Sequence, residues 1–293
     1  MRYWLIWAIA VATAGLSTPA AGQSAADARD VTSLLARIGA RIEQYFTRAQ
    51  SIMCDERVLI RPLGYSSASD GKVRTLVYEL RVAWDAAVGS GESPKATVLR
   101  ELRTINGRQP RRNEDPGCMD PRSVSPEPLS MLLPGRREAF QFSLARADRD
   151  GRPGTVVLDY RPRERGADSV TWTEDCVSVD LPGRTVGRIW ASADTGDVLR
   201  LDERLTGPFE FPIPRKHQNP FNRQQTSMTL ENATSSTRYK PVRFQEPEET
   251  LMLPASIDSL AIWRGAGSRR NIITQTFSNC RRFLTDGRIV TDR

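Results

Sequence analysis

A single histidine, His217, limits the chemistry that this chain can do. It lies in a proline-rich stretch directly after Arg215 and Lys216, where a solvated side chain is the usual state. A metal site built on histidine would have at most one such ligand, and a Ser-His-Asp triad would have to use this residue. The sequence also lacks a Gly-x-Ser-x-Gly motif that could supply the serine. We therefore expect no catalytic residues and no metal site.

Adjacent carboxylates are the next candidates for acid–base chemistry, as in Glu174–Asp175 and Glu248–Glu249. Neighbouring residues on a strand point to opposite faces, so neither pair converges unless the strand bulges. The sequence has no glycine-rich motif for a phosphate or a dinucleotide, and we expect no cofactor. A non-enzymatic protein is the favoured interpretation. An enzyme that uses carboxylates is a rival, and two or three carboxylates converging in one pocket would favour it.

The four cysteines, Cys54, Cys118, Cys176 and Cys280, lie too far apart for a Cys-x-x-Cys redox or zinc motif. An even number of cysteines in an exported protein indicates two disulfides. Four cysteines allow three pairings, and their spacing does not choose among them.

The first 22 residues have the pattern of a signal peptide. Arg2 precedes an apolar run from Tyr3 to Leu16, which is short for a membrane span, and Ala20-Ala21-Gly22 supply small residues for cleavage after Gly22. Residues 23–293 are then expected to form one periplasmic or secreted domain. No later run reaches the roughly 20 apolar residues of a transmembrane segment.

The formal net charge is +7, and the positive charges are almost all arginines. They are scattered among acidic residues, as in residues 161–168, and no basic stripe or RNA-binding motif occurs. We therefore expect no nucleic-acid partner. Attraction to an anionic lipid surface stays open.

One segment has the periodicity of an amphipathic helix. Its apolar positions follow the i, i+3, i+4, i+7 pattern, and are Val31, Leu34, Leu35, Ile38, Ile42, Tyr45 and Phe46. The pattern predicts a helix from Asp30, as its N-cap, to about Gln50.

Most of the remaining chain alternates as β-strands do. Turn signals at Asp70-Gly71, at Asn106-Gly107 and at residues 194–197 predict hairpins. The expected strands lie near 55–62, 72–85, 96–107, 139–145, 155–163, 169–181, on both sides of 194–197, and at 227–232, 237–244, 259–265, 271–283 and 288–290. A helix followed by ten or more antiparallel strands predicts a mostly β (α+β) fold. Because a long sheet must curl or be covered, we expect a curved antiparallel half-barrel capped by the N-terminal helix.

Two proline-rich stretches, 113–138 and 207–225, interrupt the strand pattern. Long loops of this kind are often lids or binding elements. The other interpretation is that both are surface loops held down by their apolar residues.

The hairpin GRIWASADTGDVLRLDERLTG (187–207), the later LPASI (253–257) and FSNCRRF (277–283) resemble segments of uncharacterised exported bacterial proteins. More distantly they resemble the LolA/LolB-like family of lipoprotein-sorting carriers, over most of residues 30–290. That resemblance implies an unclosed curved sheet with an apolar cavity for acyl chains, and no catalytic residues. It also implies a Cys118–Cys176 bridge, which leaves Cys54 and Cys280 as the second pair.

The resemblance implies a periplasmic carrier or binding protein for a lipid, an acyl chain of a lipoprotein or another apolar ligand. The expected cavity is lined by the apolar faces of two strands, namely Leu76, Tyr78, Leu80, Val82, Trp84, Phe140, Phe142 and Leu144. The same residues could instead form a closed core. The alternative function is then an envelope protein–protein interaction module with a filled core, which docks a partner protein through the two proline-rich stretches.

Overall fold

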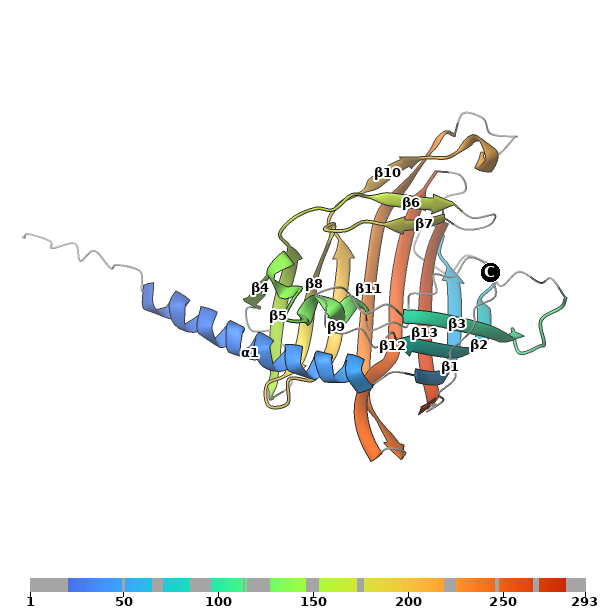
Figure 1. The fold of residues 1–293 in the computed structure, drawn as a ribbon. Coiled ribbons are helices and arrows are strands. Elements are labelled where there is room, and N and C mark those ends of the chain that lie inside the picture. Colours follow the sequence, from blue (N-terminus) through green and yellow to red (C-terminus); the bar gives the residue numbers. More distant parts are fainter. Residues whose placement is uncertain are drawn as a thin grey trace, which may run out of the picture.

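One long antiparallel sheet and one helix make up most of the computed structural model (Figure 1). The structure describes residues 21–48, 51–64, 71–84, 96–112, 114, 127–145, 153–172, 177–218, 225–245, 248–265 and 269–282. Within these ranges, the side chains of residues 21–29, Thr47, Ser51, Trp84, Ala96, Glu127 and Arg269 are not described.

The sheet has eleven strands, and all its neighbours are antiparallel. They are β1 (Ser51–Pro62), β2 (Arg74–Trp84), β3 (Ala96–Ile105), β4 (Phe140–Leu144), β5 (Thr155–Pro162), β8 (Thr185–Ser192), β9 (Val198–Leu205), β10 (Phe209–Pro212), β11 (Ser227–Gln245), β12 (Glu248–Arg264) and β13 (Arg269–Arg282). Their order is β3-β2-β1-β13-β12-β11-β9-β8-β5-β4, and β10 pairs with β11. Strands β3 and β4 end the order without pairing with each other, so the described sheet is curved but not closed (Figure 1). The expected fold class is confirmed.

The hairpins predicted at Asp70-Gly71 and at residues 194–197 are present, whereas the turn at Asn106-Gly107 is followed, among the described residues, only by a single bridge from Ile105 to Arg108. Strand β1 pairs with β2 around the Asp70-Gly71 signal, and β8 pairs with β9 around residues 194–197. Asn106 and Gly107 have φ angles of 50° and 79°, the left-handed conformation that a tight hairpin turn needs after β3.

Helix α1 (Ala21–Arg48) begins earlier than its periodicity predicted. Asp30, the expected N-cap, lies inside the helix, where its carbonyl oxygen accepts a 2.9 Å hydrogen bond from the Ser33 hydroxyl. The preceding alanines at 21, 25, 26 and 28 are strong helix formers, which is why the helix continues upstream of its apolar stripe. In Figure 1, α1 lies across one face of the sheet, called the inner face below.

The core lies between α1 and the inner face. Ile38, Leu158, Ile189 and Leu201 are fully buried there, with Phe46 2% exposed. Burial of each such side chain stabilises the fold by about 1.5–3 kcal/mol. The core thus fixes α1 against the centre of the sheet.

The first proline-rich stretch adds to this core. Its short helix η2 (Glu127–Leu132) and the following residue bury Leu129, Met131, Leu132 and Leu133 in the same apolar cluster. A Cβ on Gly39 would lie 2.9 Å from the Leu132 carbonyl oxygen, so glycine allows this close approach to α1. For the described part of this stretch, the interpretation as a segment held down by apolar residues is correct.

The second proline-rich stretch contains strand β10, which the sequence did not predict. Phe211 and Ile213 are buried, so the described part of this stretch is also held down by its apolar side chains. Phe221 lies outside the described residues.

Three expected strands are parts of two longer ones. Residues 227–232 and 237–244 belong to β11, and residues 259–265 overlap the end of β12. The pairing of β11 with β9 ends at Arg238 of β11, and the pairing of β12 with β13 ends at Ser256 of β12. Pro241 and Pro254 lie beyond these points, where only β11 and β12 pair with each other, so the missing N–H groups are tolerated. The expected strand 169–181 is instead the hairpin β6 (Ser169–Trp172) and β7 (Val177–Asp180).

A disulfide joins Cys54 of β1 to Cys280 of β13, with 4.1 Å between their Cα atoms. This is one of the two expected pairs. Cys118 and Cys176, the other expected pair, lie outside the described residues.

Candidate functional site

An apolar groove runs between α1 and the edge strand β4, and we call it the edge groove. Its volume is about 720 Å³. Its lining residues are Val31, Thr32, Leu35, Ala36, Pro134, Arg137, Glu138, Phe140, Phe142, Ser143, Leu144 and Arg163. The groove exists because β4 is an edge strand of only five residues, so its apolar side chains have a sheet neighbour on one side only.

Three of the expected cavity residues line this groove. Phe140, Phe142 and Leu144 alternate along β4 and share its inner face. Phe140 and Phe142 are half-buried against the core, and Leu144 is 38% exposed. These side chains therefore leave apolar surface available in the groove.

Four other expected cavity residues are core residues of the opposite end of the sheet. Leu80 and Val82 belong to the main apolar cluster, whereas Leu76 and Tyr78 form a second cluster with Val58 and Ile105. All four are at most 6% exposed. The eighth residue, Trp84, has a side chain outside the described set. The structure therefore separates the β2 residues from the β4 residues and fills the space beside the former.

A buried polar contact lies directly behind the groove. The Tyr160 hydroxyl donates a 2.6 Å hydrogen bond to Glu203, and the Tyr160 ring lies 6.1 Å from that of Phe140 and 6.2 Å from that of Phe142. Burial raises the pKa of Glu203, although the hydrogen bonds from Tyr160 and Ser235 oppose this shift. Burial, and the charge of Glu203, also raise the pKa of Tyr160. Both shifts favour the neutral, protonated forms of Tyr160 and Glu203, and neutral groups are less costly to bury behind an apolar wall.

A second buried polar cluster separates the two apolar clusters. Glu56 is fully buried and accepts hydrogen bonds from Arg100 at 2.8 Å and from Gln275 at 2.9 Å. Burial raises the pKa of Glu56 and the positive charge of Arg100 opposes it. The second oxygen of Glu56, Oε2, is buried and has no hydrogen-bond partner within the described chain. This cluster divides the inner face into two apolar regions.

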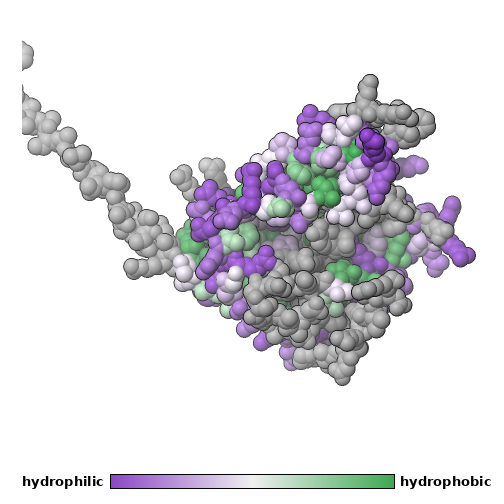
Figure 2. Space-filling view, turned by 45° about the horizontal axis from the view of Figure 1, so that its top comes forward, coloured by the Kyte–Doolittle hydropathy of each residue, from purple (hydrophilic) through white to green (hydrophobic). Residues whose placement is uncertain are grey.

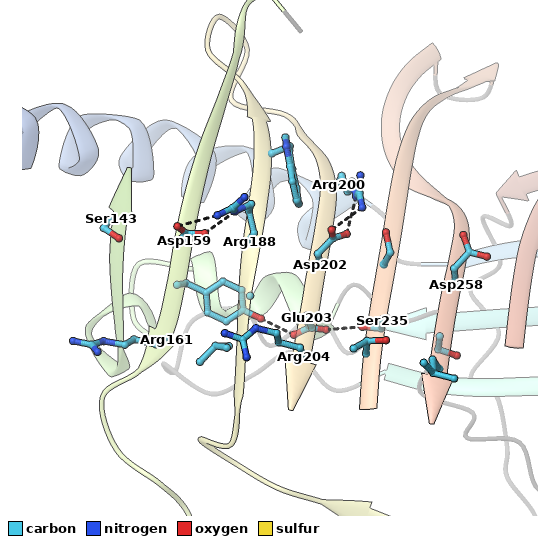
Figure 3. A pocket seen from close by; sticks show the side chains of 18 of the residues that line it. Ser143, Asp159, Arg161, Arg188, Arg200, Asp202, Glu203, Arg204, Ser235 and Asp258 are labelled. Atoms are coloured by element: carbon cyan, nitrogen blue, oxygen red, sulfur yellow. Dashed lines mark hydrogen bonds and ion pairs between the residues drawn. The ribbon is translucent and has the colours of Figure 1, made fainter. Parts of the chain in front are cut away.

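Another pocket, with a volume of about 1090 Å³, lies on the other face of the sheet, and most of the residues that line it are polar. We call it the outer-face pocket. Residues that lie directly opposite one another on neighbouring strands form one polar row across seven strands. They are Ser143, Asp159, Arg188, Asp202, Ser236, Asp258 and Thr274. Figure 3 shows several of them side by side on neighbouring strands, with α1 behind the sheet.

The carboxylates of this row are each held by an arginine. Asp159 pairs with Arg188 at 2.7 Å and Asp202 with Arg200 at 2.6 Å, whereas Asp258 is 3.6 Å from Arg238. Arg200 also lies 4.7 Å from the ring centre of Trp190. The pocket does gather carboxylates, as the rival enzyme interpretation required. Asp159 and Asp202 each pair with an arginine that also lines the pocket, so a neighbouring guanidinium opposes the charge of each.

Among the described residues, no group of three or more His, Cys, Asp or Glu side chains could hold a metal ion. Among the same residues, none of the helices combines the length and the apolar character that a membrane crossing requires. The structure brings His217 against Trp172, with the ring centres 5.0 Å apart, so this histidine is stacked rather than solvated as expected.

The sequence interpretation missed Glu203, Tyr160, Arg137 and Arg163. Glu203 could have been found, since it lies two residues after the buried Leu201 on β9 and therefore on the same face of the sheet. The arginines could not, because no periodic signal marks residues that follow a loop or end a strand.

No family model matches the chain, and no curated protein matches it. Two solved structures are similar to it. A DUF1329 family protein from Desulfovibrio piger matches with a TM-score of 0.41 and 8% identity, over 87% of this chain and 94% of that one. A LolA superfamily protein from Nitrosomonas europaea matches with a TM-score of 0.30 and 13% identity, over the same shares. The fold class follows from the sheet itself.

Proposed function

We propose that this protein is a non-enzymatic periplasmic or secreted binding protein that holds an acyl chain or another apolar ligand in the edge groove. Residues 1–22 would be its signal peptide, and residues 23–293 its single mature domain. One observation carries the proposal. Phe142 and Leu144 keep apolar surface in an open groove beside Val31 and Leu35 of α1, whereas the expected cavity residues of β2, from Leu76 to Val82, are buried in the core. Apolar ligands bind in concave apolar sites of this size.

The groove lining also contains polar side chains, namely Thr32, Arg137, Glu138, Ser143 and Arg163. In Figure 2, hydrophobic side chains reach the surface in small areas that hydrophilic side chains border. A broad apolar patch is typical of a protein–protein interface. The alternative function, an envelope interaction module, also relied on the proline-rich stretches, and the described parts of both are held down by buried side chains. We therefore favour the binding protein.

Titration with the neutral fluorescent probe N-phenyl-1-naphthylamine tests the proposal. We expect the mature protein to bind the probe and the variant Leu144→Arg to lose at least tenfold in affinity, because a guanidinium would occupy the exposed end of the groove. The matched control is Leu99→Arg on β3, since Leu99 is 48% exposed on the other edge strand. Equal binding by wild type and both variants, or no binding by wild type, would overturn the proposal.

A further inference from the structure

Two arginines line the edge groove, and neither has a carboxylate partner among the described residues. Other arginines are paired, for example Arg41 with Asp197 and Arg184 with Asp168. Arg137 and Arg163 line the groove, and within the described part of the chain neither forms an ion pair. The groove therefore contains two guanidinium groups without a protein counterion in the described chain.

The backbone holds both arginines at one end of the groove. The short helix η3 (Arg137–Ala139) leads directly into β4, and the Arg163 backbone N–H donates a 2.9 Å hydrogen bond to the Ala139 carbonyl oxygen. A Cβ on Gly39 of α1 would lie 3.8 Å from Nη1 of Arg137, so this side chain is packed near the helix. The cationic end is thus built from three separate segments.

The other end of the groove is apolar. Phe140, Phe142 and Leu144 follow the cationic end along β4, and at about 3.3 Å per residue they extend over roughly 13 Å. Val31 and Leu35 face them from α1. The groove is therefore amphiphilic along its length, with its charge at the start of β4 and its apolar wall beyond.

From this arrangement we infer that the ligand is a single-chain amphiphile with an anionic head group, a carboxylate or a phosphate. This inference rests on the proposed function and names the ligand class of the same site. The acyl chain lies along Phe142 and Leu144, and the head group accepts hydrogen bonds from Arg137 and Arg163. Guanidinium groups donate in pairs to carboxylate and phosphate oxygens, and such charge-assisted bonds are the stronger kind.

One acidic residue opposes the head group. Glu138 is exposed and is the only carboxylate in the groove lining. It follows Arg137 directly in the sequence and lines the same groove as Arg163. Removal of this charge should therefore strengthen the binding of an anion.

Displacement of the neutral probe at pH 8 tests the inference. The competitors are dodecanol, dodecanoate and dodecyl phosphate, which share a chain and differ in the head group. We expect both anions to displace the probe at lower concentration than dodecanol. Arg137→Gln and Arg163→Gln should each weaken anion binding by about three- to fivefold, the range of an exposed ion pair, with dodecanol unaffected. Glu138→Gln should strengthen anion binding, and high salt should reduce the preference.

The control is Arg161→Gln, two residues from Arg163 but in the outer-face pocket. We expect it to leave all three competitors unchanged. Stronger displacement by dodecanoate than by dodecyl phosphate identifies a carboxylate head group, and the reverse identifies a phosphate head group on a single chain. Equal displacement by dodecanol and both anions would overturn the inference while leaving the proposed function intact. Absence of probe binding by wild type would instead overturn the proposed function.

Discussion

The hydroxyl of Tyr160 donates a 2.6 Å hydrogen bond to the carboxyl group of Glu203, while its ring contacts the rings of Phe140 and Phe142. The same tyrosine thus connects the wall of the edge groove to a polar group in the interior. Opposite Tyr160, Gly187 leaves the space that the ring occupies. The shape of the groove therefore depends on residues that do not line it.

Replacement of Glu203 with glutamine should make stability less dependent on pH. Folding raises the pKa of Glu203, so the native state holds this proton more tightly than the unfolded state does. The contribution of Glu203 to the free energy of unfolding then falls as pH rises above the ordinary glutamate value of about 4.3. We expect Glu203→Gln, which keeps an acceptor for Tyr160, to be more stable than wild type at pH 7. Urea unfolding between pH 4 and 8 measures this, and a constant difference over that range would contradict the expected linkage.

Gly187→Ala should destabilise the protein by about 1–3 kcal/mol through overpacking. A Cβ there would lie 2.3 Å from the Asp202 carbonyl oxygen and 2.6 Å from the Tyr160 ring. Gly207→Ala is the matched control, because a Cβ at Gly207 meets no atom within 4 Å. Chemical denaturation of the two variants distinguishes them. If both unfold at the same denaturant concentration, the packing of Tyr160 over Gly187 is wrong.

Replacing only one residue of the Glu56–Arg100 pair should strongly destabilise the protein. Arg100→Met leaves a carboxylate in the interior without its cation, and such changes typically cost about 3–5 kcal/mol. The double variant Glu56→Met/Arg100→Met removes both charges and should recover most of that loss. Thermal or urea unfolding of wild type, Glu56→Met, Arg100→Met and the double variant tests the coupling. Simple addition of the two single effects would show that the two side chains do not interact.

The Cys54–Cys280 bridge should stabilise the protein by about 2–5 kcal/mol, since it joins residues separated by 226 positions. The variant Cys54→Ala/Cys280→Ala measures this contribution by denaturation under oxidising conditions. Peptide mapping without reduction checks the connectivity. We expect a Cys54–Cys280 peptide and a Cys118–Cys176 peptide, and a Cys54–Cys118 peptide would show that both assignments are wrong.

The local features of the fold could be predicted because local patterns encode them. The alternation of Leu76 to Val82 and the Asp194–Asp197 turn each placed a strand or a hairpin correctly. The start of α1 was missed because alanine favours the helix without taking part in an apolar stripe. Pro241 and Pro254 hid the continuity of β11 and β12, since their tolerance depends on where the neighbouring strands stop.

The site depended on longer-range order that no local pattern carries. Alternation showed that Leu80 and Phe142 face inwards, but strand order decides that Leu80 lies in a filled core and Phe142 at an edge. For this reason Leu80→Arg would report on folding, whereas a change at Leu144 reports on the groove. The edge groove is open because β4 pairs with β5 on one side and has no strand on its other side in the described sheet.

Native mass spectrometry of the mature protein, purified from an oxidising periplasm and combined with lipid extraction, tests the central claim most directly. The account predicts an additional bound mass that extracts as a lipid and is absent from the Leu144→Arg variant. A mass without ligand in the wild-type protein, unchanged after lipid is offered, would contradict it.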